Sequence, residues 1–410
     1  MLTRTVENWR ELDRIVIIGV MILALSGLMA IYSATSLQEA SALLHNSFSK
    51  QVIWLLIGVM AASAVILMPT KTLHDAAYGL YAASIVLLVL VLFIGGGKGA
   101  QRWFIFGPVH FQPSELAKIA TILALAKFLS SESRDLSRVK NIAIAFSLVA
   151  LPVVLILKQP DLGTAITTLA ILLPVMFWAG LSPFIIFLAV SPLLVVVSAF
   201  NFYTFLVAMV LITSVLFLTK RRLPMLIVIF VLNICVGALT PSLWNRLHGY
   251  QKTRILIFLG LEQDPRGTGY QVAQSQVAIG SGGFWGKGWT KGTKTKLRFL
   301  PEQHTDFIFS VIGEEFGFFG VTIILLVFFT LLWRGFQIAG EVKNKFLALV
   351  VAGSVSLIAV HVIINTGMTV GIMPVTGIPL PFLSYGGSSL LTNMILIGLI
   401  LSASTRKFQY

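Results

Sequence analysis

Cysteine and charged residues are both scarce in this chain. Its single cysteine, Cys235, lies inside an apolar run, so an intrachain disulfide and a cysteine-based metal cluster are excluded. Only 11% of the 410 residues are charged, whereas 57% are hydrophobic. With a mean hydropathy of +0.90, the chain has too little polar surface to cover a water-soluble globule. The composition therefore predicts a protein that crosses a membrane several times.

Long apolar runs fill most of the sequence. A helix crosses the hydrocarbon core with roughly 17 to 25 residues, and twelve segments reach or approach this length. Pro152, Pro174 and Pro192 lie inside three of them, and we expect each to kink its helix without ending it. The chain is thus predicted to be an all-α polytopic membrane protein. The predicted spans are 14–35, 51–68, 76–94, 114–129, 141–157, 162–178, 183–200, 203–218, 223–239, 307–333, 346–368 and 388–404.

Lysine and arginine residues mark one side of the predicted membrane. If the N-terminus is inside, most positive residues of the short connections fall on the cytoplasmic side, and the C-terminal end agrees. We therefore predict that both termini are cytoplasmic. The residues on that side are Lys71, Arg134, Arg138, Lys140, Lys220, Arg221, Arg222, Arg334, Lys343, Lys345, Arg406 and Lys407.

One long connection, residues 240–305, does not follow this rule. It carries nine lysines and arginines, and loops of this length cross the membrane regardless of their charge. Part of the net charge of +14 therefore lies in one extracytoplasmic loop. This charge indicates either an anionic partner at the outer surface or contact with anionic lipid. We treat residues 1–410 as a single membrane domain that includes this loop.

Charged residues at the ends of predicted helices are the candidate functional groups. In Leu300-Pro301-Glu302-Gln303-His304-Thr305-Asp306-Phe307, Asp306 lies at the mouth of a predicted span, a position that indicates substrate, ion or proton handling. Glu115 and Lys118 share a helix face and can pair, either in a cavity or as a purely structural pair. Asp161 precedes another helix, where it is either an N-cap or a site residue.

Other polar features are open to a structural or a functional interpretation. The run 280–289 fits a tight re-entrant turn or an anion-binding nest, and its glycine spacing excludes a nucleotide P-loop. Glu314 and Glu315 lie about two helical turns from Asp306, so at least one must face the bundle interior or water. His361 lies in mid-helix, where we expect a neutral core histidine. No helix carries histidines and carboxylates at metal-ligand spacing, so a protein-only zinc site is not expected.

Six blocks together resemble one family, the SEDS proteins (shape, elongation, division and sporulation), and they span nearly the whole chain. The runs 286–293 and 377–381 look more like its elongation members than its division members. The six blocks are Lys98-Gly99-Ala100-Gln101-Arg102-Trp103, Phe111-Gln112-Pro113-Ser114-Glu115, Gln159-Pro160-Asp161-Leu162-Gly163, Ile279-Gly280-Ser281-Gly282-Gly283, Leu300-Pro301-Glu302-Gln303-His304-Thr305-Asp306-Phe307-Ile308-Phe309 and Pro381-Phe382-Leu383-Ser384-Tyr385-Gly386-Gly387-Ser388.

The resemblance implies a SEDS-type helical bundle that acts as a peptidoglycan glycosyltransferase, polymerising lipid II at the outer face of the cytoplasmic membrane. Asp306 matches the essential acid of the family, which implies a general base or a group that helps to position a divalent cation, Mg²⁺ or Mn²⁺. Arg102, Lys118 and Arg254 would be cationic clamps for the pyrophosphate leaving group. The candidate substrate-binding residues are Arg102, Trp103, Glu115, Lys118, Asp161, Arg254, Glu302, His304 and Ser384.

The resemblance also implies partners, and the chain departs from the family in one region. The expected partners are lipid II, a class B penicillin-binding protein that acts as transpeptidase, and other proteins of the elongation complex; nucleic acid is not expected. Relatives usually have ten spanning helices, so residues 183–239 would contain an inserted pair. A lipid II flippase or other transporter is the alternative function, and a non-catalytic scaffold is a third. A flippase would depend on the mid-membrane charges more than on Asp306.

Overall fold

The structure is a computed structural model in which the chain is almost entirely helical. It describes residues 12–35, 47–96, 101–107, 109–131, 136, 138–219, 223–246, 249, 252, 256, 267–297, 300 and 302–407. Residues of the sequence analysis that lie outside this set include Lys98, Arg134, Lys220, Arg221, Arg222, Pro301 and the site candidate Arg254. Contacts divide the chain into two compact units, Met1–Ala179 with Gln263–Tyr410 (unit 1) and Gly180–Glu262 (unit 2).

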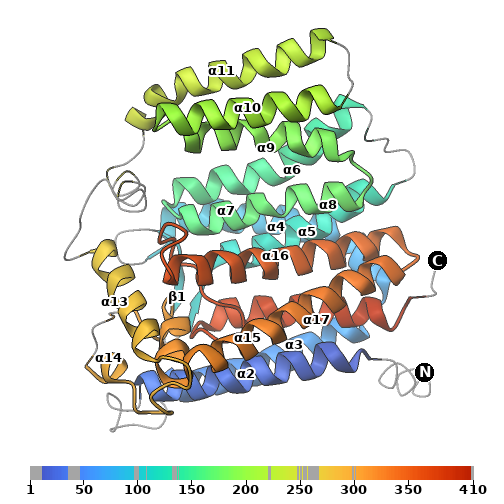
Figure 1. Cartoon of the computed structure of the whole chain (residues 1–410). Coiled ribbons are helices and arrows are strands. Elements are labelled where there is room, and N and C mark those ends of the chain that lie inside the picture. Colours follow the sequence, from blue (N-terminus) through green and yellow to red (C-terminus); the bar gives the residue numbers. More distant parts are fainter. Residues whose placement is uncertain are drawn as a thin grey trace. The chain divides into compact units, whose positions relative to one another are not determined.

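Unit 1 is a helical bundle with one short antiparallel hairpin. The strands are β1 (Phe104–Phe106) and β2 (Val109–Phe111). In Figure 1, β1, α13 and α14 gather at one end of the bundle. The helices are α2 (Arg14–Thr35), α3 (Ser47–Leu67), α4 (Thr70–Ile94), α5 (Pro113–Ser130), α6 (Val139–Lys158), α7 (Leu162–Ala170), α8 (Leu172–Trp178), α13 (Thr268–Ser281), α14 (Thr293–Lys296), α15 (Ile308–Glu341), α16 (Lys345–Thr369) and α17 (Gly387–Ser404).

The helices confirm the predicted all-α membrane architecture. Among the described residues, seven helices, α2, α3, α4, α6, α15, α16 and α17, are long and apolar enough to cross a membrane. Helix α16 lies at the centre of unit 1, because 83% of its most apolar 18-residue stretch is buried, against 22% for α3. Its Gly353 packs against Ile122 of α5 and Val175 of α8. A helix that is apolar on every side belongs in such a core.

The predicted span 162–178 differs from the expectation, because it divides into α7 and α8. Pro174 has no N–H, and its ring clashes with the carbonyl four residues earlier, that of Ala170, where α7 ends. At this point the Ile171 N–H donates to the carbonyl three residues earlier, that of Thr168, at 3.3 Å, and not to the carbonyl four residues earlier as in a regular α-helix. Pro152, in contrast, lies inside a continuous helix, α6, as predicted.

Helix α15 is interrupted near its start by Gly317, whose φ of +64° and ψ of −164° are not helical. The turn formed by residues 282–289 fills the interruption. The N–H groups of Lys287 and Gly288 donate to the carbonyls of Glu314 and Glu315, at 3.0 and 2.9 Å. A Cβ added to Gly317 would lie 2.3 Å from the Gly286 nitrogen. The glycine run is therefore a tight turn that satisfies the backbone groups freed by the break in α15.

The two glutamates beside this break are buried, as the sequence analysis expected for at least one of them. The Glu314 carboxylate accepts hydrogen bonds from Lys287 Nζ at 2.7 Å and from the N–H groups of Lys294 and Thr295 at 2.8 and 3.0 Å. It thereby caps the first turn of α14 from outside that helix. The Glu315 carboxylate accepts a hydrogen bond from the Ser33 hydroxyl of α2. These contacts fix the α14 segment to the bundle.

The described residues of unit 2 form three helices, α9 (Pro183–Ser198), α10 (Phe202–Leu218) and α11 (Leu223–Arg246). They share a small apolar core, and Asn233 of α11 donates to the Ser191 hydroxyl of α9 at 3.2 Å. Helix α11 continues to Arg246, beyond the predicted end at residue 239. The three predicted spans of this region are thus three helices, whereas their origin as an inserted pair stays a prediction. The core residues are Val195, Met209, Ile212, Leu216 and Ile229.

Candidate active site

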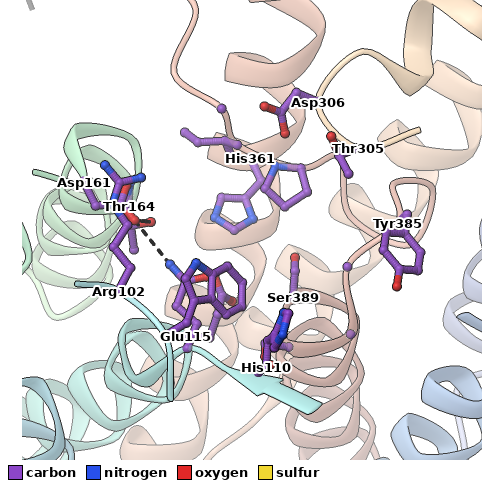
Figure 2. A pocket seen from close by; sticks show the side chains of 18 of the residues that line it. Arg102, His110, Glu115, Asp161, Thr164, Thr305, Asp306, His361, Tyr385 and Ser389 are labelled. Carbon is purple, nitrogen blue, oxygen red and sulfur yellow. Dashed lines mark hydrogen bonds between the residues drawn. The ribbon is translucent and has the colours of Figure 1, made fainter. Parts of the chain in front are cut away.

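A cavity of about 350 Å³ opens in unit 1 beside the β1–β2 hairpin. The N-terminal ends of four helices, α5, α7, α15 and α17, contribute to its walls, together with α16 (Figure 2). Most of the predicted site residues line it, although they come from segments up to about 200 positions apart in the sequence. These residues are Arg102, Trp103, Glu115, Lys118, Asp161, Glu302 and Asp306.

Asp306 lies at the start of α15, where a short turn leads into the helix. The N–H groups of Thr305 and Phe307 donate to the Glu302 carbonyl, both at 3.3 Å. Asn365, fully buried on α16, donates to the Asp306 carbonyl at 2.9 Å. The same amide donates to Ile378 O at 2.7 Å. Asn365 therefore joins the Asp306 turn to the segment that precedes α17 and fixes the backbone from which the carboxylate projects.

The Asp306 carboxylate faces the cavity beside a glycine. In Figure 2 it lies above His361, while Arg102 and Asp161 occupy the left side of the view. Gly377 has a φ of +72°, and a Cβ added there would lie 3.3 Å from Asp306 Oδ2. The glycine keeps the backbone of residues 376–378 in a left-handed turn and leaves room beside the carboxylate. Asp306 is half-buried, so it can meet both a substrate and water.

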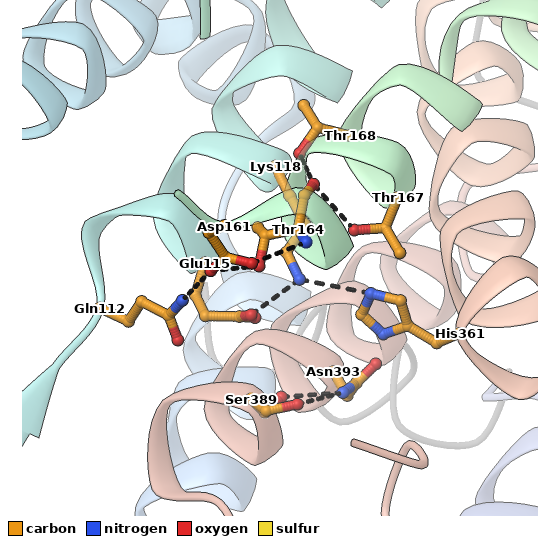
Figure 3. Close-up of polar contacts among 10 residues, drawn as sticks. All are labelled: Gln112, Glu115, Lys118, Asp161, Thr164, Thr167, Thr168, His361, Ser389 and Asn393. Atoms are coloured by element: carbon orange, nitrogen blue, oxygen red, sulfur yellow. Dashed lines mark hydrogen bonds and ion pairs between the residues drawn. The ribbon is translucent and has the colours of Figure 1, made fainter. Parts of the chain in front are cut away.

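Glu115 and Lys118 form the predicted pair at the base of the cavity (Figure 3). Lys118 Nζ lies 2.8 Å from Glu115 Oε1, and the two side chains are only 2% and 7% exposed. Lys118 Nζ also lies 3.3 Å from His361 Nε2 on α16. A lysine ammonium can only donate, so Nε2 is the acceptor and the imidazole is neutral in this contact. His361 is buried and neutral, as expected, but it belongs to the cavity wall.

Asp161 combines the two roles that the sequence analysis left open. As N-cap of α7, its carboxylate accepts from the Thr164 N–H at 3.1 Å and from the Thr164 hydroxyl at 2.9 Å. Gln112, the residue before α5, donates to Asp161 Oδ2 at 3.2 Å. Asp161 also lines the cavity. The carboxylate therefore joins the starts of α5 and α7 at the edge of the site.

Arg102 and Trp103 enter the cavity from the residues before β1. Arg102 Nε donates to Gln159 O at 3.0 Å, and its Nη2 donates to the Pro160 carbonyl. A guanidinium has five N–H groups, so three remain for a ligand. Trp103 pairs with Gly96 through two backbone hydrogen bonds of 2.9 and 3.2 Å, and its ring lies 6.4 Å from that of His110. The hairpin thus presents an arginine and an aromatic wall together.

Two of the described site candidates do not line the cavity. His304 lies behind Tyr385, a lining residue, with ring centroids 5.6 Å apart, and its carbonyl accepts from the Tyr385 N–H at 2.9 Å. The Ser384 hydroxyl is buried and accepts a hydrogen bond from the Leu380 N–H at 2.8 Å. Both residues therefore shape the wall from outside. Arg254 lies outside the described residues.

Other lining residues were not predicted as site residues. Trp54 of α3 gave no signal in the sequence, because it lies inside an apolar span like any lipid-facing tryptophan. Its ring packs against Gly387, where a Cβ would lie 2.2 Å from Trp54 Cε2. Only the Gly386-Gly387 pair could have indicated a close approach at the start of α17. The other residues of this kind are His110, Gln112, Thr164, Thr167, Thr305, His361, Tyr385, Ser388 and Ser389.

Within the described residues, no group of three or more His, Cys, Asp and Glu side chains is arranged to hold a metal ion. Asp306 and Glu302 both line the cavity, so their carboxylates are candidate ligands. Mg²⁺ is commonly bound by one or two carboxylates together with phosphate oxygens of a substrate. The site therefore fits a cation that is shared with a phosphorylated ligand, and Asp306 and Glu302 are the residues that would hold it.

Known proteins cover the chain almost completely. The family model FTSW_RODA_SPOVE, described as "Cell cycle protein", matches residues 13–203 and 181–409. The peptidoglycan glycosyltransferase MrdB of Escherichia coli (strain K12) is 36% identical over 397 residues, which are 96% of this chain and 95% of MrdB. The peptidoglycan glycosyltransferase RodA of Treponema pallidum is 34% identical over an alignment of 429 positions, which covers 97% of this chain and 98% of that protein.

Solved structures agree with the sequence matches. A chain of a peptidoglycan synthase complex, solved to show how polymerization and crosslinking are coordinated, is 32% identical with a TM-score of 0.73, covering 97% of this chain and 99% of that chain. RodA of Thermus thermophilus, a rod shape determining protein, is 29% identical with a TM-score of 0.64, covering 98% and 100%. The chain therefore belongs to the FtsW, RodA and SpoVE family of integral membrane proteins, the SEDS family.

Proposed function

We propose that this chain is a peptidoglycan glycosyltransferase that polymerises lipid II during cell elongation and thereby maintains cell shape. The names of its relatives support the reaction class. One observation supports the location of the chemistry. Asp306 shares one cavity with Arg102 and with the N-terminal ends of four helices. A carboxylate able to accept a proton thus lies beside groups that favour an anion.

In the proposed reaction, the 4-hydroxyl of an acceptor sugar attacks the anomeric carbon of a lipid-linked donor. A new carbon–oxygen bond forms while the bond to undecaprenyl pyrophosphate breaks, and its electron pair leaves with the pyrophosphate. The proton of the attacking hydroxyl passes to the Asp306 carboxylate, the general base. Such proton transfer contributes typically 10²- to 10⁴-fold to the rate. The reaction inverts the anomeric carbon in one step, so it needs no covalent enzyme intermediate.

The leaving pyrophosphate requires positive charge, and the cavity supplies it in three ways. Arg102 keeps three N–H groups available and is held in place by the Gln159 and Pro160 carbonyls. Lys118 is neutralised by Glu115, so it contributes less charge than the sequence analysis assumed. At the start of α17, where Gly387, Ser388 and Ser389 line the cavity, the N-cap residue Gly386 has no side chain to cap the helix, and its own N–H donates to Gln51 Oε1 at 3.2 Å. The backbone N–H groups of an uncapped helix start favour phosphate.

A divalent cation shared with the pyrophosphate would supply further charge neutralisation. Trp54, Trp103 and Tyr385 line the cavity and provide aromatic faces on which a sugar ring can lie. Arg254, the third predicted clamp, remains part of the proposal from its sequence position. These groups would hold the donor so that its anomeric carbon meets the acceptor hydroxyl beside Asp306.

Orientation and partners complete the proposal. Positive residues on one side of the spans support cytoplasmic N- and C-termini. With that orientation, the cavity would face the extracytoplasmic side of the cytoplasmic membrane. A similar chain has been solved within a synthase complex that combines polymerization with crosslinking. This supports a class B penicillin-binding protein as the transpeptidase partner, together with other elongation proteins.

The test is polymerisation of labelled lipid II by the purified chain with its transpeptidase partner. We expect glycan strands from the wild type and at least a hundredfold lower rate for Asp306→Asn, which keeps the shape of the side chain but cannot act as the base. Asp75→Asn is the matched control, because Asp75 is exposed on α4 and does not line the cavity. It should retain wild-type activity.

Two outcomes would contradict the proposal. Equal product from Asp306→Asn and the wild type would remove Asp306 from the chemistry. The absence of product from an intact complex, together with movement of lipid II between leaflets of liposomes, would favour a flippase. An added chelator reports separately on the divalent cation.

A further inference from the structure

A second cavity, of about 520 Å³, lies at the opposite end of the same helices. Helices α3 and α17 carry Trp54 and Gly387 in the candidate active site near their starts, whereas Leu67 and Arg406 line the second cavity near their ends. In the predicted topology this is the cytoplasmic side of the membrane. The second cavity is lined by Leu67, Pro69, Thr70, Lys71, His74, Asn344, Phe346 and Arg406.

Arg406 is the unusual residue of this cavity, because its charge is buried and no carboxylate of the described residues pairs with it. It is only 7% exposed. Its guanidinium donates to the Ser402 hydroxyl at 2.8 Å, to Ile66 O at 3.0 Å and to the Thr70 hydroxyl at 3.4 Å. All three acceptors are neutral, and burial lowers the pKa of the group from its ordinary value. A buried cation is normally paired with an anion.

The rest of the cavity wall adds positive charge. Lys71 is exposed and His74 half-exposed, and no carboxylate is among the lining residues in the part of the chain that the structure describes. The carboxylate beside His74 belongs to Asp75, at 3.4 Å; it is 62% exposed and lies outside the lining. Three basic side chains therefore border this cavity. Arg406 is the most buried of them, and it has no acidic partner among the described residues.

Two helices also begin at this cavity. Helix α4 starts at Thr70 after Pro69, with no side-chain cap and no acidic residue in its first turn. Helix α16 starts after Asn344, which caps it through a 3.1 Å bond from the Leu347 N–H, again with no acidic residue in the first turn. The positive ends of both helix dipoles therefore border the cavity, which adds to the charge of the three side chains.

We propose that this cavity binds a phosphate-bearing anion, with Arg406 as the inner contact and Lys71 at the mouth. The chemistry required is a phosphate monoester, diester or free phosphate, because a guanidinium fork and helix N-termini both match its oxygens. Two sources have this chemistry. One is the headgroup of an anionic lipid in the cytoplasmic leaflet, and the other is soluble phosphate. The site is distinct from the candidate active site and does not depend on the proposed reaction.

The test measures binding to the full-length chain, purified in neutral detergent, by native mass spectrometry with three probes. The probes are phosphatidylglycerol, zwitterionic phosphatidylcholine and inorganic phosphate. We expect one tightly held anionic ligand on the wild type and about fivefold weaker binding to Lys71→Gln, since one basic group near a membrane surface has roughly this effect. Arg406→Lys keeps the charge but loses the fork, and we expect at least tenfold weaker binding.

Lys140→Gln is the matched control, because Lys140 lies in the first turn of α6, on the same predicted side, and is exposed outside the cavity. It makes the same charge change and should bind like the wild type. Arg406 also donates a hydrogen bond to the Ile66 carbonyl, so Arg406→Lys can disturb folding. Lys71 makes no such bond within the described part of the chain, so Lys71→Gln tests binding without this effect.

The outcomes separate the two sources and can overturn the proposal. A preference for phosphatidylglycerol that inorganic phosphate does not displace would support a lipid headgroup. Displacement by inorganic phosphate, or binding of phosphate alone, would support a soluble ligand at the same site. Equal loss of binding in Lys71→Gln and Lys140→Gln would refute the site, because the attraction would then be diffuse surface charge. Equal binding of phosphatidylcholine and phosphatidylglycerol would refute it as well.

Discussion

Replacing Glu115 with glutamine tests whether the pair at the base of the active-site cavity is desolvated. Glutamine keeps the shape of the side chain and can still accept a hydrogen bond from Lys118, 2.8 Å away in the wild type. It removes the negative charge, however. The carboxylate of Asp161 is already engaged in capping α7. Lys118, whose side chain is 2% exposed, would then carry an uncompensated charge.

The expected cost follows from the burial of the pair. Removing one partner of a buried ion pair typically destabilises a protein by about 3 to 5 kcal/mol. We expect the lower end, roughly 3 kcal/mol, because both side chains border a cavity that can admit water. Glu341→Gln is the matched control: Glu341 pairs with Arg334 at 3.1 Å and Lys407 at 2.6 Å, but its side chain is 42% exposed. Exposed pairs contribute at most about 1 kcal/mol.

The assay is thermal unfolding of both variants in the same detergent, followed by their apparent midpoints. Glu115→Gln should unfold at a clearly lower temperature than Glu341→Gln. The double variant Glu115→Gln with Lys118→Met removes the uncompensated charge of Lys118 as well. It should therefore recover part of the decrease in the unfolding midpoint. Equal midpoints for the two single variants would refute the reasoning, because Lys118 would then be well hydrated. A double variant that folds but does not polymerise lipid II would show that the charges also serve the reaction.

Two further variants test the backbone and the arginine. Gly317→Ala should lower the unfolding midpoint, since φ is +64° and the new Cβ would lie 2.3 Å from the Gly286 nitrogen. The control is Gly79→Ala in α4, where the new Cβ would have no atom within 4 Å, and it should be neutral or stabilising. Equal effects of the two substitutions would contradict the tight turn. Arg102→Lys keeps the charge but loses the planar guanidinium whose Nε and Nη2 donate to the Gln159 and Pro160 carbonyls. We expect at least tenfold weaker polymerisation, mainly through KM for lipid II, and an unchanged KM would argue against an anion clamp.

Local sequence patterns predicted most helices well, because their signal is local. The start and end of α2 agree with the predicted span 14–35, since a membrane-spanning helix needs only a sufficient apolar length. The Glu115 and Lys118 contact was predictable for the same reason, because residues three apart on a helix face each other. Pro174 shows the limit. Whether a proline kinks or divides a helix depends on what satisfies the carbonyls around it.

The parts of the site that the sequence did not reveal are contacts between distant segments. Lys118 meets His361 across 243 positions, and a histidine inside an apolar span gives no sign of its partner. Trp54 reaches the cavity only because Gly387 lacks a side chain that would exclude its ring. The residues of 240–305 were predicted as one loop, yet they include the end of α11 together with α13 and α14. Helices this polar are stabilised by packing that the local sequence does not show.

The described lining of the candidate active site lies outside residues 183–239, where the sequence analysis predicted an inserted helix pair. Every described residue that lines the candidate active site belongs to unit 1, on either side of 180–262 in the sequence, whereas Arg254, within 180–262, lies outside the described residues. Unit 2 has its own core around Val195 and Ile212 and its own buried polar contact between Asn233 and Ser191. The described part of the proposed site therefore contains no side chain from α9, α10 or α11. Variation at Asp306 or Arg102 would act on the proposed reaction itself.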